Sequence, residues 1–149
     1  MTDRRIALLL TRPLAQSKGF VNLFEGVSQP SPVHICISPL FEIIFQGPLP
    51  DMSLYRSLIF TSSNGVRAFS QLKPSSILPS FTVGKVTAET AISVGLPAQM
   101  LGLDVQDFTE AILSLKPETP CLHLRGDISR SALATQLSNA GLATDEAIV

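Results

Sequence analysis

A short apolar segment that ends abruptly in polar residues constrains the fold of this chain more than any other feature. Residues 58–60 are Leu-Ile-Phe, and residues 61–65 read Thr-Ser-Ser-Asn-Gly. Apolar residues at helical spacing then continue from residue 66. This order is typical of a buried parallel strand whose carboxyl end leads into a helix. Hydroxyl groups at such a point can cap the helix, and the N–H groups behind them attract anions.

The same alternation of apolar runs and helix-like segments recurs along the chain and predicts an α/β fold. Strands are expected at residues 6–10, 33–37, 58–61, 81–84, 121–124 and 145–149. Helices are expected at residues 15–24, 63–72, 87–94, 109–115 and 131–140. Such alternation implies a parallel sheet covered by helices, and we expect a flavodoxin-like domain. Residues 6–10, which are apolar on both faces, are expected to form a central strand.

Changes in composition along the chain divide it into two parts. Residues 1–36 contain one strand–helix–strand unit, of the length usual for a parallel βαβ motif. Residues 37–52 include Gly47, Pro48 and Pro50, which interrupt regular structure, so this stretch is interpreted as a connector. It leads into a second α/β domain, and together they occupy residues 37–149.

The composition excludes several classes of protein. Of the 149 residues, 45% are hydrophobic and 15% are charged, and the net charge is −1, which indicates a compact globular protein. The lack of a Lys/Arg cluster argues against a nucleic-acid partner. No apolar run is long enough for a membrane span or a signal peptide, so a cytoplasmic protein is expected. Cys36 and Cys121 lack metal-binding spacing and are expected to be buried, reduced thiols.

Polar residues follow four of the expected strands, where ligands bind in open α/β sheets. They supply hydroxyl groups, glycines that permit close backbone approach, and guanidinium groups. The candidates for the site are Arg12, Thr61, Ser62, Ser63, Gly84, Thr87, Arg125, Gly126 and Arg130. Such groups, together with the N–H groups of helix starts, can hold a polycarboxylate without a broad basic patch. No pattern of a nucleophilic triad, a zinc site or a nucleotide-binding loop accompanies them.

Each candidate also has a simpler structural interpretation. Ser62, Ser63 and Thr87 stand where helix caps are common. The guanidinium groups of Arg125 and Arg130 can equally be surface charges, although two arginines around one glycine favour contact with an anion.

Two histidines and one lysine are interpreted structurally as well. His34 and His123 lie inside expected strands, so each is predicted to be a packed or edge residue rather than a base. Lys85 follows Gly84 at an expected helix start and is predicted to be solvated.

Four segments, taken in order, resemble the uroporphyrinogen-III synthase family. They are Leu9-Leu10-Thr11-Arg12-Pro13, Ile59-Phe60-Thr61-Ser62-Ser63-Asn64-Gly65-Val66, Val83-Gly84 with Thr87-Ala88 and Gly95, and Leu124-Arg125-Gly126 with Arg130 and Leu133. The resemblance implies a two-domain α/β enzyme that converts the linear tetrapyrrole hydroxymethylbilane to uroporphyrinogen III by loss of water, inversion of ring D and ring closure. It also implies that the enzyme is a cytoplasmic monomer in haem biosynthesis that uses no metal or organic cofactor.

The resemblance implies roles for individual residues. Thr87 matches the threonine of the family's Val-Gly-x-x-Thr-Ala segment and is the implied catalytic residue, which assists departure of the substrate hydroxyl group. A threonine is too weak an acid to transfer its proton fully, so hydrogen bonding is its expected role. The implied substrate contacts are Arg12, Thr61, Ser62, Ser63, Gly84, Arg125, Gly126 and Arg130.

The resemblance extends over the N-terminal part of the family sequence. Family members have a discontinuous first domain, so residues 1–36 correspond to its opening segment and residues 37–149 to the second domain. The family's tyrosine after the strand at residues 145–149, and the return to the first domain, have no counterpart, so we interpret the chain as truncated, with its own activity in question. We expect residues 1–36 to be mobile, to repack on the second domain, or to exchange with a second copy.

Two other interpretations are compatible with the same pattern. One is a non-catalytic α/β binding module that retains affinity for tetrapyrroles or other polycarboxylates. The other is an unrelated receiver-like or flavodoxin-like domain, although the sequence lacks the acidic pocket of the first and the aromatic flavin loop of the second. The uroporphyrinogen isomer formed from hydroxymethylbilane separates the enzyme from the binding module.

Overall fold

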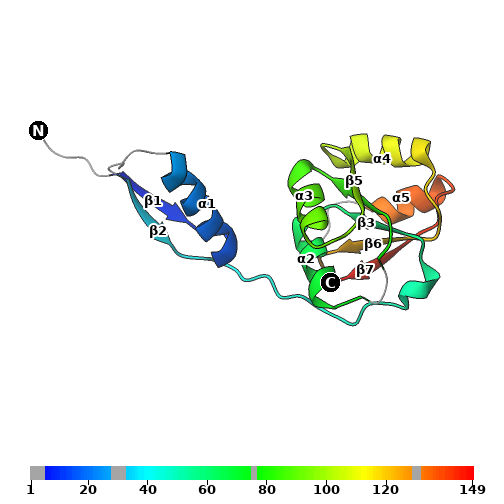
Figure 1. Cartoon of the computed structure of the whole chain (residues 1–149), viewed down its shortest axis with the longest axis horizontal. Helices are drawn as coiled ribbons and strands as arrows, with labels where there is room; N and C mark the ends of the chain where they lie inside the picture. The colour runs from blue at the N-terminus through cyan, green and yellow to red at the C-terminus, as the bar shows by residue number, and fades with distance from the viewer. Residues whose placement is uncertain (1–5, 28–32, 75–76, 129–131) are drawn as a thin grey trace, which may run out of the picture. The chain divides into compact units, whose positions relative to one another are not determined.

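The chain forms two compact units (Figure 1). The computed structural model describes residues 6–27, 33–74, 77–128 and 132–149. Unit 1 comprises Met1–Ile44, and unit 2 comprises Phe45–Val149. The division falls within residues 37–52, and the described chain forms no strand between residue 38 and the short 3₁₀ helix η1 (Met52–Leu54). No helix in the described parts of the chain is both long and apolar enough to cross a membrane.

Unit 1 is a parallel strand–helix–strand motif made of β1 (Ile6–Leu10), α1 (Leu14–Val27) and β2 (Val33–Ile37). Ser17 fixes the turn into α1, because its hydroxyl group donates to the carbonyl oxygen of Arg12 at 2.9 Å. Within the described residues β1 pairs with β2 alone, so the prediction of a central strand here is wrong. Among the described residues of unit 1, no helix covers the other face of this two-stranded sheet, which we call its open face.

The open face of this small sheet carries apolar side chains. Leu9 is 59% exposed, and Cys36, its partner in the strand register, is exposed as well. The prediction that Cys36 is buried is therefore wrong, whereas Cys121 in unit 2 is buried as predicted. The difference arises because strands buried on both faces occur only where helices cover both sides of a sheet.

Unit 2 is a five-stranded parallel sheet flanked by helices, which confirms the predicted α/β class. Its strands are β3 (Ser57–Phe60), β4 (Ser80–Val83), β5 (Ala98–Gly102), β6 (Cys121–Arg125) and β7 (Thr144–Ile148). Its helices are α2 (Ser63–Gln71), α3 (Lys85–Ser93), α4 (Val105–Leu115) and α5 (Leu133–Asn139). The spatial order is β5-β4-β3-β6-β7, or 3-2-1-4-5 counted from β3. This is the order of Rossmann-type sheets rather than the flavodoxin order 2-1-3-4-5.

The side chains of the central strand β3 alternate between two helix-covered faces. Leu58 and Phe60 pack in the layer of α2 and α3, whereas Ile59 packs in the layer of α4 and α5. The first layer includes Val66, Phe69, Ala91, Leu122 and Leu124, and the second includes Phe81, Phe108, Ile112, Leu133 and Leu137. Burial on both faces explains why β3 has a continuous apolar run.

The predicted elements form within a few residues of their expected ends, except that one strand was missed. The missed strand is β5, which lies at the edge of the sheet. Its residues Gln99 and Met100 are exposed, so it lacks the apolar run that marks a buried strand. Helix α3 begins at Lys85, which places Thr87 inside the helix instead of at its cap.

Candidate functional site

The carboxyl ends of β3 and β6 lie side by side where the order of strands across the sheet reverses. β3 pairs with β4 on one side and with β6 on the other. The chain leaves β3 toward α2 on one face of the sheet, and it leaves β6 toward α5 on the opposite face. Ligands bind at such a reversal because the two loops diverge. We call this region the switch edge, and it comprises residues 61–67, 84–87 and 123–127 together with Glu146.

The turn from β3 into α2 forms the first part of the switch edge. Ser62 is the N-cap of α2, and its hydroxyl oxygen accepts a hydrogen bond from the N–H of Asn64 at 3.2 Å. The interpretation of Ser62 as a helix cap is thus confirmed. Ser62 is also exposed, and the cap uses its oxygen as an acceptor, so the hydroxyl hydrogen can still donate to a ligand.

Arg67 brings a guanidinium group to the same turn. Its Nη1 atom donates to the Oγ atom of Ser63 at 3.2 Å and to the Oδ1 atom of Asn64 at 3.1 Å. The sequence interpretation missed Arg67, although a residue four positions after Ser63 in a helix lies on the same face. The start of α2 therefore combines N–H groups, a hydroxyl and a positive charge, all of which suit an anion.

The turn from β4 into α3 forms the second part. Gly84 is the N-cap of α3 with φ = 75°, a conformation that glycine adopts without strain. The N–H of Gly84 donates to the carbonyl oxygen of Gly102 at 2.8 Å, so the structure already uses this donor. Thr87 lies in the first turn of α3 and is 6% exposed, and the prediction that it caps the helix is wrong. The N–H groups of that first turn are the donors that α3 presents at the switch edge.

Arg125, which ends β6, forms the third part of the switch edge. Its Nε atom donates to the Oε2 atom of Glu146 at 2.8 Å. Its Nη1 atom donates to the carbonyl oxygens of Gly126 and Asp127 at 2.9 and 3.0 Å. These three bonds fix the guanidinium group, and the carboxylate of Glu146 offsets part of its charge.

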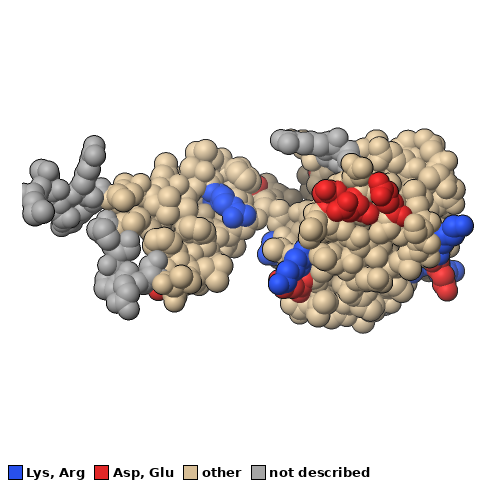
Figure 2. Space-filling view, turned by 90° about the horizontal axis from the view of Figure 1, so that it is seen from above, with Lys and Arg blue, Asp and Glu red and all other residues tan. Residues whose placement is uncertain are grey.

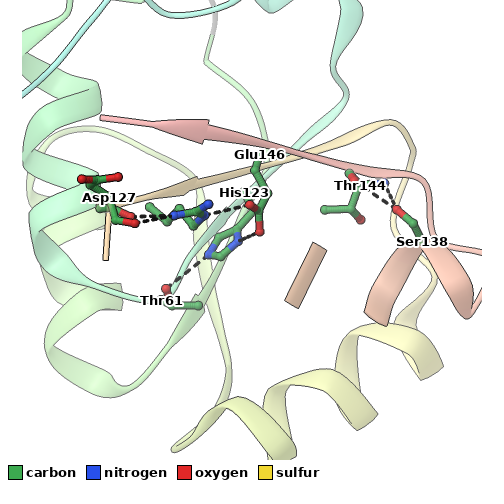
Figure 3. A network of polar contacts seen from close by, with 8 residues as sticks. Thr61, His123, Asp127, Ser138, Thr144 and Glu146 are labelled. Atoms are coloured by element: carbon green, nitrogen blue, oxygen red, sulfur yellow. Dashed lines mark hydrogen bonds and ion pairs between the residues drawn. The ribbon is translucent and has the colours of Figure 1, made fainter. Parts of the chain in front are cut away.

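His123 lies two residues before Arg125 and is fully buried. Its Nε2 atom is 3.3 Å from the Oγ1 atom of Thr61, and its Nδ1 atom is 3.7 Å from the Oε1 atom of Glu146 (Figure 3). Burial lowers the pKa of His123; the Glu146 carboxylate opposes this shift, and the charge of Arg125 adds to it. The imidazole is therefore neutral at physiological pH. The prediction of a packed histidine is confirmed, but its polar partners were missed because they come from different strands.

The structure brings most of the predicted residues of unit 2 to one edge. Those at the switch edge are Thr61, Ser62, Ser63, Gly84, Thr87, Arg125 and Gly126. Arg12 follows β1 and belongs to unit 1, and Arg130 lies outside the described residues. Lys85 projects into solvent as predicted, with its side chain 80% exposed.

Charged side chains of the described residues are sparse on the face of the molecule that Figure 2 shows. On the face shown in Figure 2 the Lys and Arg side chains are scattered, and acidic side chains gather over unit 2. An anion at the switch edge would therefore be held by nearby N–H, hydroxyl and guanidinium groups rather than by a broad positive field.

A comparison with models of known protein families identifies the family of the chain. The family model described as uroporphyrinogen-III synthase HemD matches residues 32–149. The chain belongs to the uroporphyrinogen-III synthase family. The matched region includes all of unit 2 and hence every residue of the switch edge. A comparison with curated proteins gave no match.

A solved structure of the family has the same fold. The crystal structure of uroporphyrinogen-III synthetase from Helicobacter pylori 26695 matches with a TM-score of 0.65 at 20% sequence identity. The match covers 98% of this chain and 61% of that one, so the chain spans less than two thirds of the length of this relative.

Proposed function

We propose that this protein acts as a uroporphyrinogen-III synthase, a cyclising hydro-lyase of tetrapyrrole and haem biosynthesis. The reaction converts hydroxymethylbilane to uroporphyrinogen III by loss of water, inversion of ring D and ring closure. The observation that carries this proposal is the family match over residues 32–149, within which the anion-binding groups of unit 2 converge on the switch edge. The cytoplasm is the proposed location, since Cys36 and Cys121 are both free thiols.

Binding of the substrate carboxylates is assigned to the starts of α2 and α3 and to the arginines beside them. Ser62 donates its hydroxyl hydrogen, and the N–H groups of both helix starts complement negative charge. Arg67 and Arg125 supply guanidinium groups, and hydrogen bonds within the protein already orient both groups. Such preorganisation lowers the entropy lost when a flexible polycarboxylate binds.

Thr87 is the proposed catalytic residue. Its hydroxyl group would hydrogen-bond the departing hydroxyl of the substrate at the start of α3, where the helix dipole stabilises developing negative charge. Only 6% of Thr87 is exposed, so its contact with substrate is confined to a small, largely dehydrated surface. A hydrogen bond is stronger in such surroundings than in water.

The two parts of the chain that the sequence predicts have separate proposed roles. Residues 37–149 would form one domain around the switch edge, with residues 37–52 as its connector. Residues 1–36 would contribute Arg12 as part of a discontinuous first domain, and the functional protein would be a monomer. Gly126 and Arg130 would contact the substrate beside Arg125.

The isomer of the cyclic product tests the activity. Hydroxymethylbilane closes spontaneously to uroporphyrinogen I, so we expect the protein to yield uroporphyrinogen III above that background. Thr87→Val should lower the fraction of type III product, whereas Thr87→Ser, which keeps the hydroxyl group, should retain more of it. A type I product alone would contradict the proposal, and uroporphyrinogen bound without turnover would identify a non-catalytic tetrapyrrole-binding module.

A further inference from the structure

The polar contacts of His123 determine how Thr61 meets a ligand. His123 is fully buried, and its Nδ1 atom has no hydrogen-bond partner among the described residues. Its Nε2 atom lies 3.3 Å from the Oγ1 atom of Thr61. A neutral imidazole has one N–H and one lone pair. The ring nitrogen that carries the proton therefore decides whether Thr61 donates or accepts in this hydrogen bond.

Glu146 favours a proton on Nδ1. Its Oε1 atom is 3.7 Å from Nδ1, which is too far for a good hydrogen bond. The carboxylate charge still acts on the ring at this distance, because the buried surroundings of the ring screen the charge less than bulk water does. Arg125 holds the other carboxylate oxygen at 2.8 Å and so fixes the orientation of the carboxylate group beside the ring. A carboxylate attracts an N–H and repels a lone pair. Nε2 is left with the lone pair, and the hydroxyl group of Thr61 donates to it.

Strand register keeps these groups together. His123 on β6 pairs with Glu146 on β7 and with Ile59 on β3. Thr61 lies two residues after Ile59, so its side chain projects from the same face as that of His123. Two adjacent strands, β6 and β7, and the residue that directly follows β3 thus supply the three groups, and the sheet fixes their separation.

We infer that His123 and Glu146 are positioning residues that commit the hydroxyl hydrogen of Thr61 to the protein, so that Thr61 offers a ligand only acceptor lone pairs. An N–H group of a ligand fits this oxygen, and a carboxylate does not. The inference rests on the proposed function, because the tetrapyrrole substrate carries both pyrrole N–H groups and carboxylates. It assigns a pyrrole N–H to Thr61 and leaves the carboxylates to the helix starts and arginines. The expectation that Thr61 contacts an anion changes accordingly.

Nitrogen-15 NMR of the imidazole rings in the ligand-free protein tests which nitrogen of His123 carries the proton. The chain has two histidines, and the exposed His34 can be removed as His34→Gln to assign the remaining signals. We expect His123 to show a protonated Nδ1 and a bare Nε2. Glu146→Gln should shift the population toward the Nε2–H form, while Asp145→Asn, which removes a neighbouring carboxylate, should not. A protonated Nε2 in the unmodified protein would overturn the inference and leave the proposed function untouched.

Binding of two ligands tests whether Thr61 accepts a hydrogen bond from an N–H group of the ligand. Uroporphyrinogen I carries pyrrole N–H groups and carboxylates, whereas citrate carries carboxylates alone. Thr61→Val should weaken binding of uroporphyrinogen I by about 3–10-fold, the effect of one lost hydrogen bond, and leave citrate binding within about twofold. Thr61→Ser should preserve both affinities. An equal loss for both ligands would overturn the assignment of an N–H group to Thr61, and a protein that binds neither would overturn the proposed function as well.

Discussion

The Nε atom of Arg125 lies 2.8 Å from the Oε2 atom of Glu146, where β6 and β7 end beside each other. The two side chains are 20% and 29% exposed, so water screens the pair only in part. The ion pair gives the arginine a fixed direction at the switch edge. It also places a carboxylate where the carboxylate of a ligand would compete for the same guanidinium group.

Removal of that carboxylate should strengthen binding of a polycarboxylate. We expect Glu146→Gln to bind citrate about 3–10-fold more tightly at low ionic strength, since partly exposed charge pairs contribute on the order of 1 kcal/mol. The gain should shrink as salt screens the charges. Calorimetric titration at two salt concentrations measures both effects.

Asp145→Asn is the matched control for this change. It removes the same charge one residue away, but Asp145 accepts a hydrogen bond from Tyr55 at 3.2 Å and forms no hydrogen bond or ion pair with Arg125. Equal gains for Glu146→Gln and Asp145→Asn would show that net charge alone governs binding. The Arg125–Glu146 pair would then have no specific part in it.

Gly65 allows α2 to pack closely against β6. A Cβ atom at this position would lie 2.9 Å from the backbone carbonyl oxygen of Leu124, closer than such atoms approach. We expect Gly65→Ala to lower the free energy of unfolding by about 1–3 kcal/mol, because backbone must move to relieve the contact. Thermal unfolding measures the loss. Gly126→Ala is the control, since a Cβ atom there meets nothing within 4 Å.

The sequence predicted the sheet of unit 2 well where strands are buried on both faces. A continuous apolar run marked β3, the apolar residues on both sides of His123 marked β6, and a polar turn marked the start of α2. The edge strand β5 was missed because its exposed residues carry no such signal. The strand order was not predictable from local patterns, since it depends on which crossover packs on which face.

Only the residues of the candidate site that lie at the ends of strands could be predicted from the sequence. Ser62 and Arg125 lie within two residues of the last apolar residue of a strand, so the rule that ligands bind at carboxyl ends of strands locates them. The contacts of His123 depend on the register of β6 with β7, and those of Arg67 depend on which face of α2 is exposed. Neither quantity is visible in a local pattern of residues, although the helical spacing of Arg67 was a usable signal.

The two cysteines should differ sharply in reactivity. Burial raises the pKa of the Cys121 thiol to about 11, and the residue is fully buried, so little reactive thiolate forms. Cys36 is exposed on β2. We expect iodoacetamide to modify one thiol quickly in the folded protein, and peptide mass spectrometry should locate it at Cys36. Equal labelling of Cys121 before denaturation would show that β6 opens readily.

Amide hydrogens of unit 1 should exchange faster than those of the central sheet. Among the described strands β1 pairs with one neighbour and has exposed side chains, whereas β3 is paired on both sides and covered on both faces. Exchange follows the free energy of local opening, which is small where few apolar contacts must break. Hydrogen exchange read by mass spectrometry should show β1 exchanging before β3. Similar protection of the two strands would contradict this expectation.

Acid should destabilise the protein partly through His123. Burial lowers the pKa of His123 in the folded state, so the unfolded chain binds this proton at a higher pH than the folded protein does. Stability is therefore complete above the ordinary histidine pKa and falls as pH drops toward the lowered value. Glu146 and Arg125 face the ring and modify the shift in opposite directions. Denaturant unfolding between about pH 7 and pH 5 should show a smaller loss for His123→Gln than for the unmodified protein, while His34→Gln should follow the unmodified protein. Parallel losses in all three proteins would show that the carboxylates alone cause the acid sensitivity.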